Sequence, residues 1–325
     1  MPSLPGSSLM RGDRGRTLSG AIPSMHEAGI GTFARVDSLD STMVWCRREL
    51  LNRTSHPGLT LSQAVQTLFV HTEGVNQLDV CEEQELDADL LPLSVLCADR
   101  QTAGTGRLGR PWTMESGKSF AGSFVFALDA RSADLLGTGW LTTLTGICVI
   151  AALQEVASAY GTQLRSPLGL KWPNDIFCEG NKLGGILSQS IAQYDGTRVV
   201  VFGIGLNLFM DHDELPAAPA TSLHRLTTSP LPDYACVRDD LAYAIARQLQ
   251  VRLSEYLKTP TASHAALRQL ALAESVTVGR PAHVTLVDSR AFDAQALDID
   301  LDAALVVRTR AGGILTVTTG DVGVQ

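Results

Sequence analysis

The sequence predicts an α+β protein in which helices pack on one face of a mixed β-sheet and a small β-barrel follows at the C-terminus. Three observations support this fold class. Strand-like runs follow one another in hairpin fashion, without regular strand–helix–strand spacing. Two long segments, 140–160 and 238–257, have the apolar content of helices that pack on a sheet. From about residue 275, five short strand-like runs alternate with turns, which is typical of a small barrel.

The N-terminal quarter of the chain contains few regular elements. Residues 1–25 are rich in Gly, Ser, Pro and Arg and lack apolar periodicity, which predicts a disordered tail. A short strand is predicted over 33–36 and a helix over 41–51, whose free N–H groups Asp40 or Ser41 could cap. Residues 54–92 contain a run of acidic side chains between 79 and 89, which predicts a solvated surface insertion.

The middle of the chain alternates apolar runs with turn signals. Predicted strands occupy 93–98, 123–128, 169–172, 182–191 and 199–203. The Pro-Asn-Asp turn separates the third of these strands from the fourth, and a loop is predicted over 211–219. Residues 135–154 carry no charge and approach membrane-spanning length, but their glycines and threonines favour a buried helix.

The C-terminal part begins with a helix whose apolar residues recur at helical spacing. They are Leu241, Ile245, Leu249, Leu253 and Tyr256. The five short strands expected after it are 276–278, 282–287, 296–299, 304–308 and 315–318.

Composition narrows the class of protein. The chain has 325 residues, 45% of them hydrophobic and 18% charged, as in soluble proteins long enough for more than one domain. A formal net charge of −8 argues against general nucleic-acid binding. The six cysteines form no C-x-x-C pair and several lie in apolar runs, which predicts free buried thiols. Free thiols and the lack of a signal peptide favour the cytoplasm.

Residues 99–112 form a loop rich in glycine and arginine. Gly104, Gly106 and Gly109 permit close backbone approach to a ligand, and Arg107 and Arg110 supply permanent positive charge. Such a loop at a strand end suits an anionic small molecule.

Two familiar motifs do not fit this loop. A dinucleotide-binding G-x-G-x-x-G must open a helix, but Pro111, Gly117 and Gly122 interrupt the following residues. A P-loop needs a glycine where Trp112 stands. An adenylate-forming loop is the third interpretation, and it needs support from elsewhere in the chain.

Two further segments supply that support. Residues 171–187 contain Lys-Trp-Pro-Asn-Asp and then Lys-Leu-Gly-Gly-Ile-Leu, and residues 203–207 read Gly-Ile-Gly-Leu-Asn. These segments follow the loop ending at Trp112 in the same order as in the biotin protein ligases. The chain resembles that family from about residue 33 to the C-terminus. The resemblance implies a class II synthetase-like catalytic domain over 26–272 and an SH3-like domain over 273–325, where residues 320–322 match a Gly-Asp-Val segment of the family. About thirty residues precede the first strand, so we expect the monofunctional type without a DNA-binding domain.

The resemblance implies a two-step reaction with ATP, biotin and Mg²⁺. Biotin and ATP give biotinyl-5′-AMP, and a lysine of a biotin carboxyl carrier protein domain then accepts the biotin. No nucleic-acid or membrane partner is expected, and the oligomeric state is left open between a monomer and a weak homodimer. A lipoate or octanoate protein ligase of the same superfamily and a non-enzymatic biotin-sensing protein are the alternatives.

The resemblance also implies roles for individual residues. Lys182 and Arg107 are the expected catalytic residues, with Lys182 bridging carboxylate and phosphate oxygens. The residues expected to contact biotin are Ser41, Thr42, Met43, Gln101, Gly104, Thr105, Gly106, Arg107, Lys182 and Gly185. Those expected to contact ATP or the adenylate are Arg107, Arg110, Trp112, Asn174, Lys182 and Asn207. Asp175 is expected either to orient a lysine or to contact Mg²⁺, and the sequence does not decide between these roles. Lys171 is expected to contribute a positive charge with a structural role.

Two positions depart from the family pattern. Met43 stands where the family has asparagine, and Thr105 stands where it usually has arginine. The first change removes an amide and the second removes a positive charge. By itself Lys182 reads as a surface lysine in a turn, since Glu179, Gly180 and Asn181 precede it.

Overall fold

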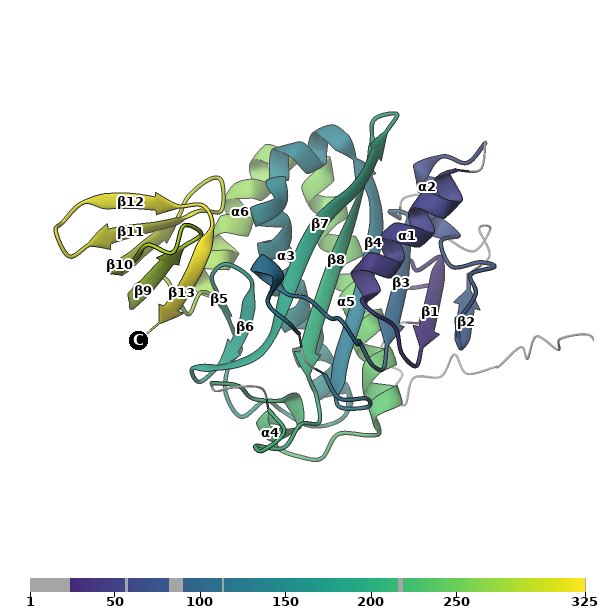
Figure 1. Cartoon of the computed structure of the whole chain (residues 1–325), viewed down its shortest axis with the longest axis horizontal. Coiled ribbons are helices and arrows are strands. Elements are labelled where there is room, and N and C mark those ends of the chain that lie inside the picture. The colour runs from purple at the N-terminus through teal and green to yellow at the C-terminus, as the bar shows by residue number, and fades with distance from the viewer. Residues whose placement is uncertain (1–23, 56–57, 82–89, 113, 216–218, 325) are drawn as a thin grey trace, which may run out of the picture.

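The computed structural model describes residues 24–55, 58–81, 90–112, 114–215 and 219–324 (Figure 1). The expected tail lies almost wholly outside these residues, as does most of the acidic run, 82–89.

An eight-stranded mixed sheet forms the centre of the molecule, as predicted. Its strands are β1 Thr32–Val36, β2 Gln77–Val80, β3 Leu93–Ala98, β4 Ser119–Asp129, β5 Gly169–Lys171, β6 Asp175–Cys178, β7 Asn181–Tyr194 and β8 Thr197–Asn207. They lie in the order β2-β1-β3-β4-β8-β7-β6-β5, and only the β1–β3 pair is parallel. Strands β2 and β6 were not predicted, and β4, β7 and β8 are longer than the sequence indicated.

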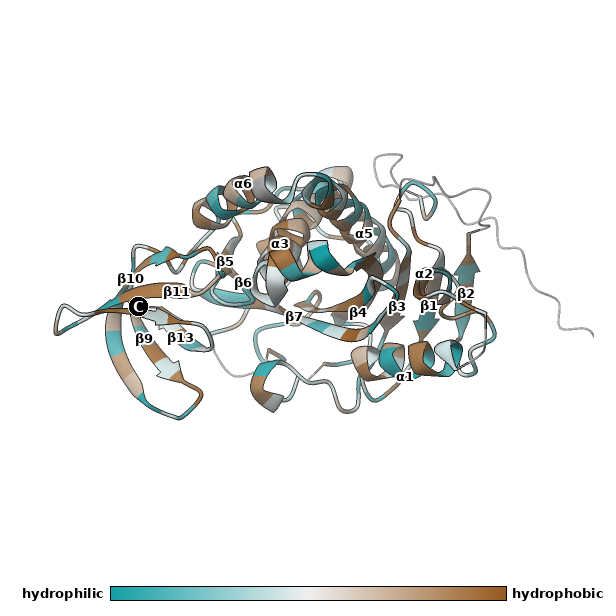
Figure 2. Ribbon diagram, turned by 90° about the horizontal axis from the view of Figure 1, so that it is seen from above, coloured by the Kyte–Doolittle hydropathy of each residue, from teal (hydrophilic) through white to brown (hydrophobic). Residues whose placement is uncertain are grey.

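Helices cover both faces of this sheet, so the prediction that they pack on one face is wrong (Figure 2). The helices are α1 Thr42–Thr54, α2 Leu61–Gln66, α3 Ala130–Ala159, α4 Leu223–Leu226, α5 Tyr234–Lys258 and α6 Pro260–Ala273. Alternation along β4 shows the two faces: Phe124 and Phe126 pack in the core with α3 and α5, whereas Val125 and Ala127 pack in the core with α1 and α2.

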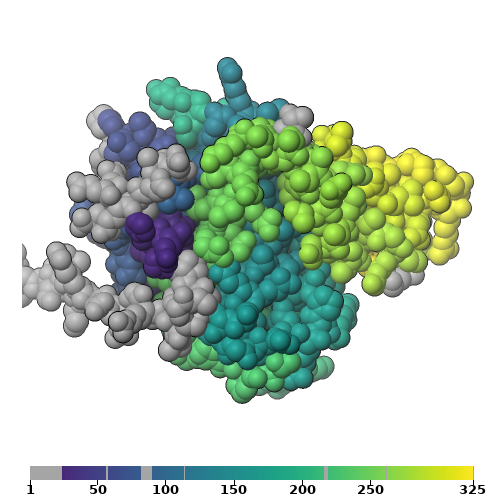
Figure 3. All heavy atoms as spheres, turned by 180° about the vertical axis from the view of Figure 1, so that it is seen from behind, coloured from purple at the N-terminus to yellow at the C-terminus, as the bar shows by residue number. Residues whose placement is uncertain are grey.

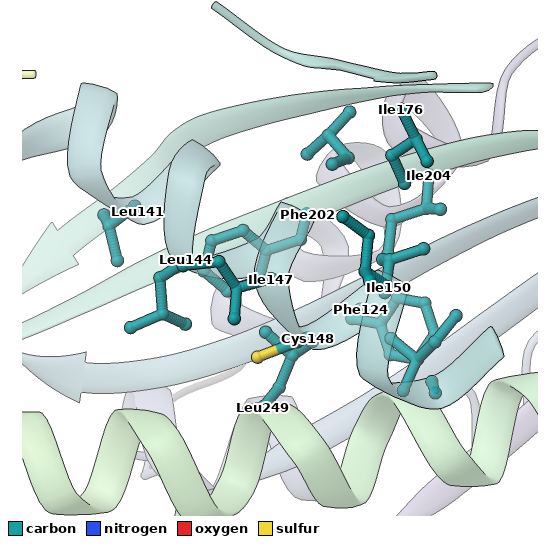
Figure 4. Packing of buried hydrophobic residues seen from close by; sticks show 14 of the residues in the cluster. Phe124, Leu141, Leu144, Ile147, Cys148, Ile150, Ile176, Phe202, Ile204 and Leu249 are labelled. Atoms are coloured by element: carbon teal, nitrogen blue, oxygen red, sulfur yellow. The ribbon is translucent and has the colours of Figure 1, made fainter. Parts of the chain in front are cut away.

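The long helix α3 lies in the larger core. In the described part of the chain it is the one helix long and apolar enough to cross a membrane, and 61% of its most apolar stretch is buried. It contacts α5 and several strands of the sheet, and Gly137, with φ of 70°, interrupts its first turns. Figure 4 shows α3 side chains gathered with those of β4, β8 and α5, among them Ile147, Cys148, Phe124, Phe202 and Leu249. The prediction of a buried helix is confirmed.

The segment between α1 and β3 belongs to the fold, so the prediction of a solvated insertion is wrong for its described part. Leu68 and Phe69 are fully buried beneath the sheet, together with the apolar side of α2. Strand β2 pairs with β1 at the sheet edge, and Asp79 forms an ion pair with the buried Arg35.

A second, five-stranded antiparallel sheet forms the C-terminal domain. Its strands are β9 Pro281–Leu286, β10 Ala291–Ile299, β11 Leu305–Thr309, β12 Ile314–Val317 and β13 Gly320–Val324, in the order β12-β11-β10-β9-β13. The strand expected over 276–278 does not form, and β13 is the fifth strand instead. From behind, this domain lies against the region of α6 (Figure 3).

Hydrogen bonds from two indoles attach the C-terminal domain to the domain built on the eight-stranded sheet. Trp140 of α3 donates to the carbonyl of Leu301 at 2.6 Å, and Trp172 donates to that of Ala303 at 2.9 Å. The prediction missed α6, which adds a third attachment through Arg268 and the carbonyl of Ile299.

No disulfide joins the six cysteines. Cys46, Cys97, Cys148 and Cys178 are buried, as predicted, and burial raises the pKa of each thiol.

We predict that the second core, under α1 and α2, is needed for stability. Leu68→Ala should lower the free energy of unfolding by about 2–5 kcal/mol, because it opens a cavity at a fully buried position. Leu59→Ala is the matched control, since Leu59 is 40% exposed and should change stability by less than about 0.5 kcal/mol. Urea unfolding followed by circular dichroism measures both, and equal effects would contradict the assignment.

Candidate functional site

A cleft of about 950 Å³, including its open mouth, lies where β7 and β8 meet the glycine/arginine loop, the start of α1 and strand β13. It gathers most of the residues selected from the sequence. They are Ser41, Thr42, Met43, Gln101, Thr105, Gly106, Arg107, Arg110, Trp112, Asn174, Asp175, Lys182 and Gly185. Gly104 and Asn207 are absent from its wall.

Those two residues support the site from outside. A Cβ at Gly104 would lie 2.8 Å from the Trp112 carbonyl oxygen and 2.9 Å from Nε2 of Gln101, so glycine allows the loop to fold on itself. Asn207 is 1% exposed and its side chain donates to the Thr221 carbonyl. Its place in the structure is a brace at the end of β8, away from the cleft.

Hydrogen-bonding side chains line one end of the cleft. Oε1 of Gln101 accepts from the backbone N–H of Thr42 at 2.7 Å and from the Thr42 hydroxyl at 3.1 Å, while Ser123 donates to that hydroxyl at 2.8 Å. Gln101 therefore satisfies one of the free N–H groups at the start of α1. The predicted cap is wrong, because the Ser41 side chain forms no capping bond and Asp40 accepts only from the N–H of Ser41, which precedes the helix.

Two glycines of β8 make room for two large side chains of the cleft. The side chain of Met43 lies against Gly203, and the Trp112 ring lies against Gly205, where a Cβ would meet the ring at 2.6 Å. Nε1 of Trp112 is buried and has no hydrogen-bond partner in the described parts of the chain. A buried donor left unpaired is unusual, and a ligand could satisfy it.

Lys182 and Asp175 lie at the other end of the cleft. Their Nζ and Oδ1 atoms are 2.6 Å apart, and Gly185 leaves space beside them. A bulge between β6 and β7 aims Lys182 at Asp175, since Phe177 pairs with Lys182 whereas Ile176 pairs with Gly184. Lys182 is the second residue of β7, so its interpretation as a turn lysine is wrong.

Backbone contacts fix the start of β7. The N–H of Lys182 donates to the carbonyl of Pro219, and its own carbonyl accepts from Thr221. Residues 219–221 thus brace Lys182. Lys171 lies on the far side of Asp175, 3.9 Å from Oδ2, and burial lowers its pKa although Asp175 and Asp321 favour its charge.

The two loop arginines contact the C-terminal domain. Nη1 of Arg107 donates to the Gly320 carbonyl at 3.3 Å and lies 3.5 Å from Oδ1 of Asn174. Arg110 forms a 3.0 Å ion pair with Asp321. Burial lowers the pKa of Arg107. For Asp321, burial alone would raise the pKa, but the neighbouring Arg110 and Lys171 outweigh it and the pKa lies below its ordinary value. These contacts hold the loop against β13.

Several residues of the cleft wall were not predicted, among them Gly320 and Asp321. Ser123, which is fully buried and donates to the Thr42 hydroxyl, was not predicted either. It gave no signal, because a serine in an apolar strand looks like an ordinary strand residue. Gly320 and Asp321 were noticed as a family segment, but no role followed from sequence, because nothing indicated that β13 reaches the cleft.

Asp175 and Asp321 are the carboxylates among the described lining residues, and each already faces a cation. In the described ranges no group of three or more His, Cys, Asp or Glu residues could hold a metal ion.

Comparisons with known proteins agree with this architecture. A family model described as the biotin/lipoate A/B protein ligase family matches residues 75–207. The chain is 30% identical over 261 residues to the biotin–[acetyl-CoA-carboxylase] ligase of Mycobacterium tuberculosis, covering 77% of this chain and 89% of that protein. It is 32% identical over 223 residues to the enzyme of the same name from Paracoccus denitrificans, covering 66% and 84%.

A solved structure shows the same fold. The biotin protein ligase from Aquifex aeolicus matches 90% of this chain and 98% of its own, with a TM-score of 0.59 and 19% identity. The extent and identity of the match to the Mycobacterium tuberculosis protein show that this chain belongs to the family of biotin–[acetyl-CoA-carboxylase] ligases.

Proposed function

We propose that the chain is an ATP-dependent biotin–protein ligase that forms biotinyl-5′-AMP in the described cleft and transfers biotin to a lysine of a carboxyl carrier domain. The observation that carries this proposal is the division of one cleft into two ends. Thr42 and Gln101 provide neutral hydrogen-bonding groups at one end, and Arg107, Arg110 and Lys182 provide positive charge at the other. Biotin has a neutral ureido ring and a carboxylate at opposite ends of the molecule.

In the first step, a carboxylate oxygen of biotin attacks the α-phosphorus of ATP. A new O–P bond forms, the bond to the β-phosphate oxygen breaks, and pyrophosphate leaves. Catalysis of such a displacement depends on fixed positive charge near the phosphoryl oxygens. Arg107 and Lys182 are placed for this work, because the cleft is locally cationic although the chain has a net charge of −8.

Mg²⁺ is the proposed metal ion, bound with the triphosphate. Asp175, ion-paired with Lys182, is the proposed orienting partner of that lysine. Trp112 and Asn174 line the same part of the cleft and are the proposed contacts of the adenine base.

In the second step, the neutral amine of an acceptor lysine attacks the acyl carbonyl, an amide bond forms and AMP leaves. Bound water must be kept from the acyl phosphate. The loop 103–119 is the proposed cover, anchored through Arg107 and Arg110 to β13. The buried free thiols of Cys46, Cys97, Cys148 and Cys178 support a reducing compartment, so we place the reaction in the cytoplasm.

Mass spectrometry of an acceptor domain tests this function. The domain is incubated with the protein, ATP and Mg²⁺, and with biotin or lipoate in separate reactions. A mass increase of one biotinyl group in the first reaction alone is expected. An increase with lipoate alone would assign the protein to the related lipoate ligases, and no increase in either reaction would contradict a ligase.

We predict that Lys182→Ala abolishes adenylate formation. The substitution removes the ammonium group nearest to Asp175 in the cleft, while the backbone bonds to Pro219 and Thr221 remain. Because the side chain is 35% exposed, the free energy of unfolding should fall by about 1 kcal/mol or less. Pyrophosphate release with biotin and ATP measures the first step, and wild-type release by this variant would show that Lys182 is misassigned.

Arg107→Ala should raise the KM for ATP and slow the first step. Its hydrogen bonds to described residues are long, at 3.3 and 3.5 Å, so the guanidinium is available to phosphate. Its loss should cost about 2–4 kcal/mol of transition-state stabilisation. Arg290→Ala is the matched control, because Arg290 pairs with Asp288 on the surface of the C-terminal domain. Wild-type affinity of Arg107→Ala for preformed biotinyl-AMP would contradict the phosphate role.

The two departures from the family pattern give a paired prediction. Met43 faces the cleft beside Gly203 and offers only a weak sulfur acceptor, so Met43→Asn should tighten biotin by about 1–3 kcal/mol. Thr105→Arg should mainly tighten the anionic adenylate. Isothermal titration of each variant with biotin and with a non-hydrolysable adenylate analogue separates the two effects. Weaker biotin binding by Met43→Asn would place the ureido ring elsewhere.

A further inference from the structure

Asp175 lies in the wall between two cavities of the protein. It lines the ligand cleft, and it also lines a smaller inner cavity of about 330 Å³, including its opening to solvent, between α3, the turn after β5 and the C-terminal domain. Lys171 lines the inner cavity and is absent from the described lining of the cleft. Lys182 lines the cleft. The carboxylate thus faces one ammonium group on each side.

The two lysines differ in freedom of movement. The Lys182 side chain is 35% exposed and opens into the cleft, whereas that of Lys171 is 13% exposed. The Lys171 ammonium also lies 5.1 Å from the centre of the Phe177 ring, which attracts a cation. Lys182 can move toward a ligand, and Lys171 stays where it is.

Movement of Lys182 would normally be unfavourable. The Asp175 side chain is only 15% exposed, and a largely buried carboxylate that loses its partner is left without a compensating charge. Lys171, 3.9 Å from Oδ2, reduces this penalty because it remains beside Asp175 when the 2.6 Å contact with Lys182 breaks.

We propose that Lys171 is a positioning residue, which keeps Asp175 compensated so that Lys182 can leave it and bind the carboxylate and phosphoryl oxygens of the reactants. This inference rests on the proposed function, because it assumes that Lys182 binds those oxygens. Lys171 does not touch the reactants, and it acts through Asp175 and Lys182.

Two variants and a control measure the effect on the first step. Lys171→Met removes the charge, Lys171→Arg retains it, and Lys258→Met makes the same change at an exposed lysine at the end of α5. We expect Lys171→Met to lower kcat for biotin-dependent pyrophosphate release about tenfold or more, with the KM for biotin within about threefold of wild type. Lys171→Arg should recover most of the rate, and Lys258→Met should match wild type. A raised KM with unchanged kcat, or no recovery with arginine, would overturn the proposal.

A double-mutant cycle separates positioning from a structural role. Isothermal titration with a non-hydrolysable biotinyl-adenylate analogue is done for Lys171→Met in the wild-type and the Lys182→Ala backgrounds. We expect about tenfold weaker binding in the first background and less than about twofold in the second, where no ammonium has to leave Asp175. Equal weakening in both backgrounds would show a structural role and overturn the proposal.

Failure of the inference can be told from failure of the proposed function. Biotin-dependent pyrophosphate release by the wild-type protein, lost in Lys182→Ala, supports the function whatever Lys171 does. Normal kinetics of Lys171→Met in that case overturn only the role of Lys171. If thermal unfolding shows that Lys171→Met does not fold, Lys171→Gln repeats both measurements, since it removes the charge and keeps a polar side chain of similar reach.

Discussion

The lack of side chains along neighbouring parts of β7 and β8 is the constraint on which the site depends. A Cβ at Gly184 would collide with the Gly205 carbonyl, and Cβ atoms at Gly203 and Gly205 would collide with Met43 and Trp112. At Gly185 a Cβ would lie 3.2 Å from Oδ1 of Asp175. Glycine weakens a strand, because it loses more conformational freedom on folding than other residues. Pairing with β4 and β6 on either side holds these strands in place, so the two central strands can leave a cleft above their backbone.

The C-terminal domain completes this cleft, and the turn after β5 connects the two. Trp172 bonds to the Ala303 carbonyl of the second domain, while Asn174 and Asp175, two and three residues later, line the cleft. Strand β13 then returns to Arg107 and Arg110 from the opposite side. One group of contacts therefore sets both the position of the second domain and the shape of the cleft beside Arg107 and Arg110. The domain is part of the site rather than an appended module.

Sequence patterns predicted the parts of the protein that depend on neighbouring residues. Strand β3 has the predicted bounds, and residues 99–112 form a loop with one short 3-10 turn, because the apolar run and the glycines act locally. The parts set by distant contacts were missed. The covering of the second face depends on Leu68 and Phe69 meeting strands far along the chain. Helix α6 was missed although Pro260, at its first position, is a helix-start signal. The cleft residues came from their resemblance to a family, whereas Ser123 and Asp321 could be placed only by the fold.

The parallel pairing of β1 with β3 has a consequence for how the protein folds. Phe33 of β1 lies opposite Val95 of β3, and α1, α2 and β2 come between these two strands in sequence. The two strands can therefore pair only after this whole segment has folded back to bring β3 beside β1. Pairings between residues so far apart in sequence form slowly, because a long loop must close before any contact compensates its lost entropy. The arginine-rich loop begins at the end of β3, and Gln101 reaches back to the start of α1 only when β3 lies beside β1. The cationic cleft is thus expected to assemble late in folding, and incompletely folded chains would not hold the reactive acyl phosphate.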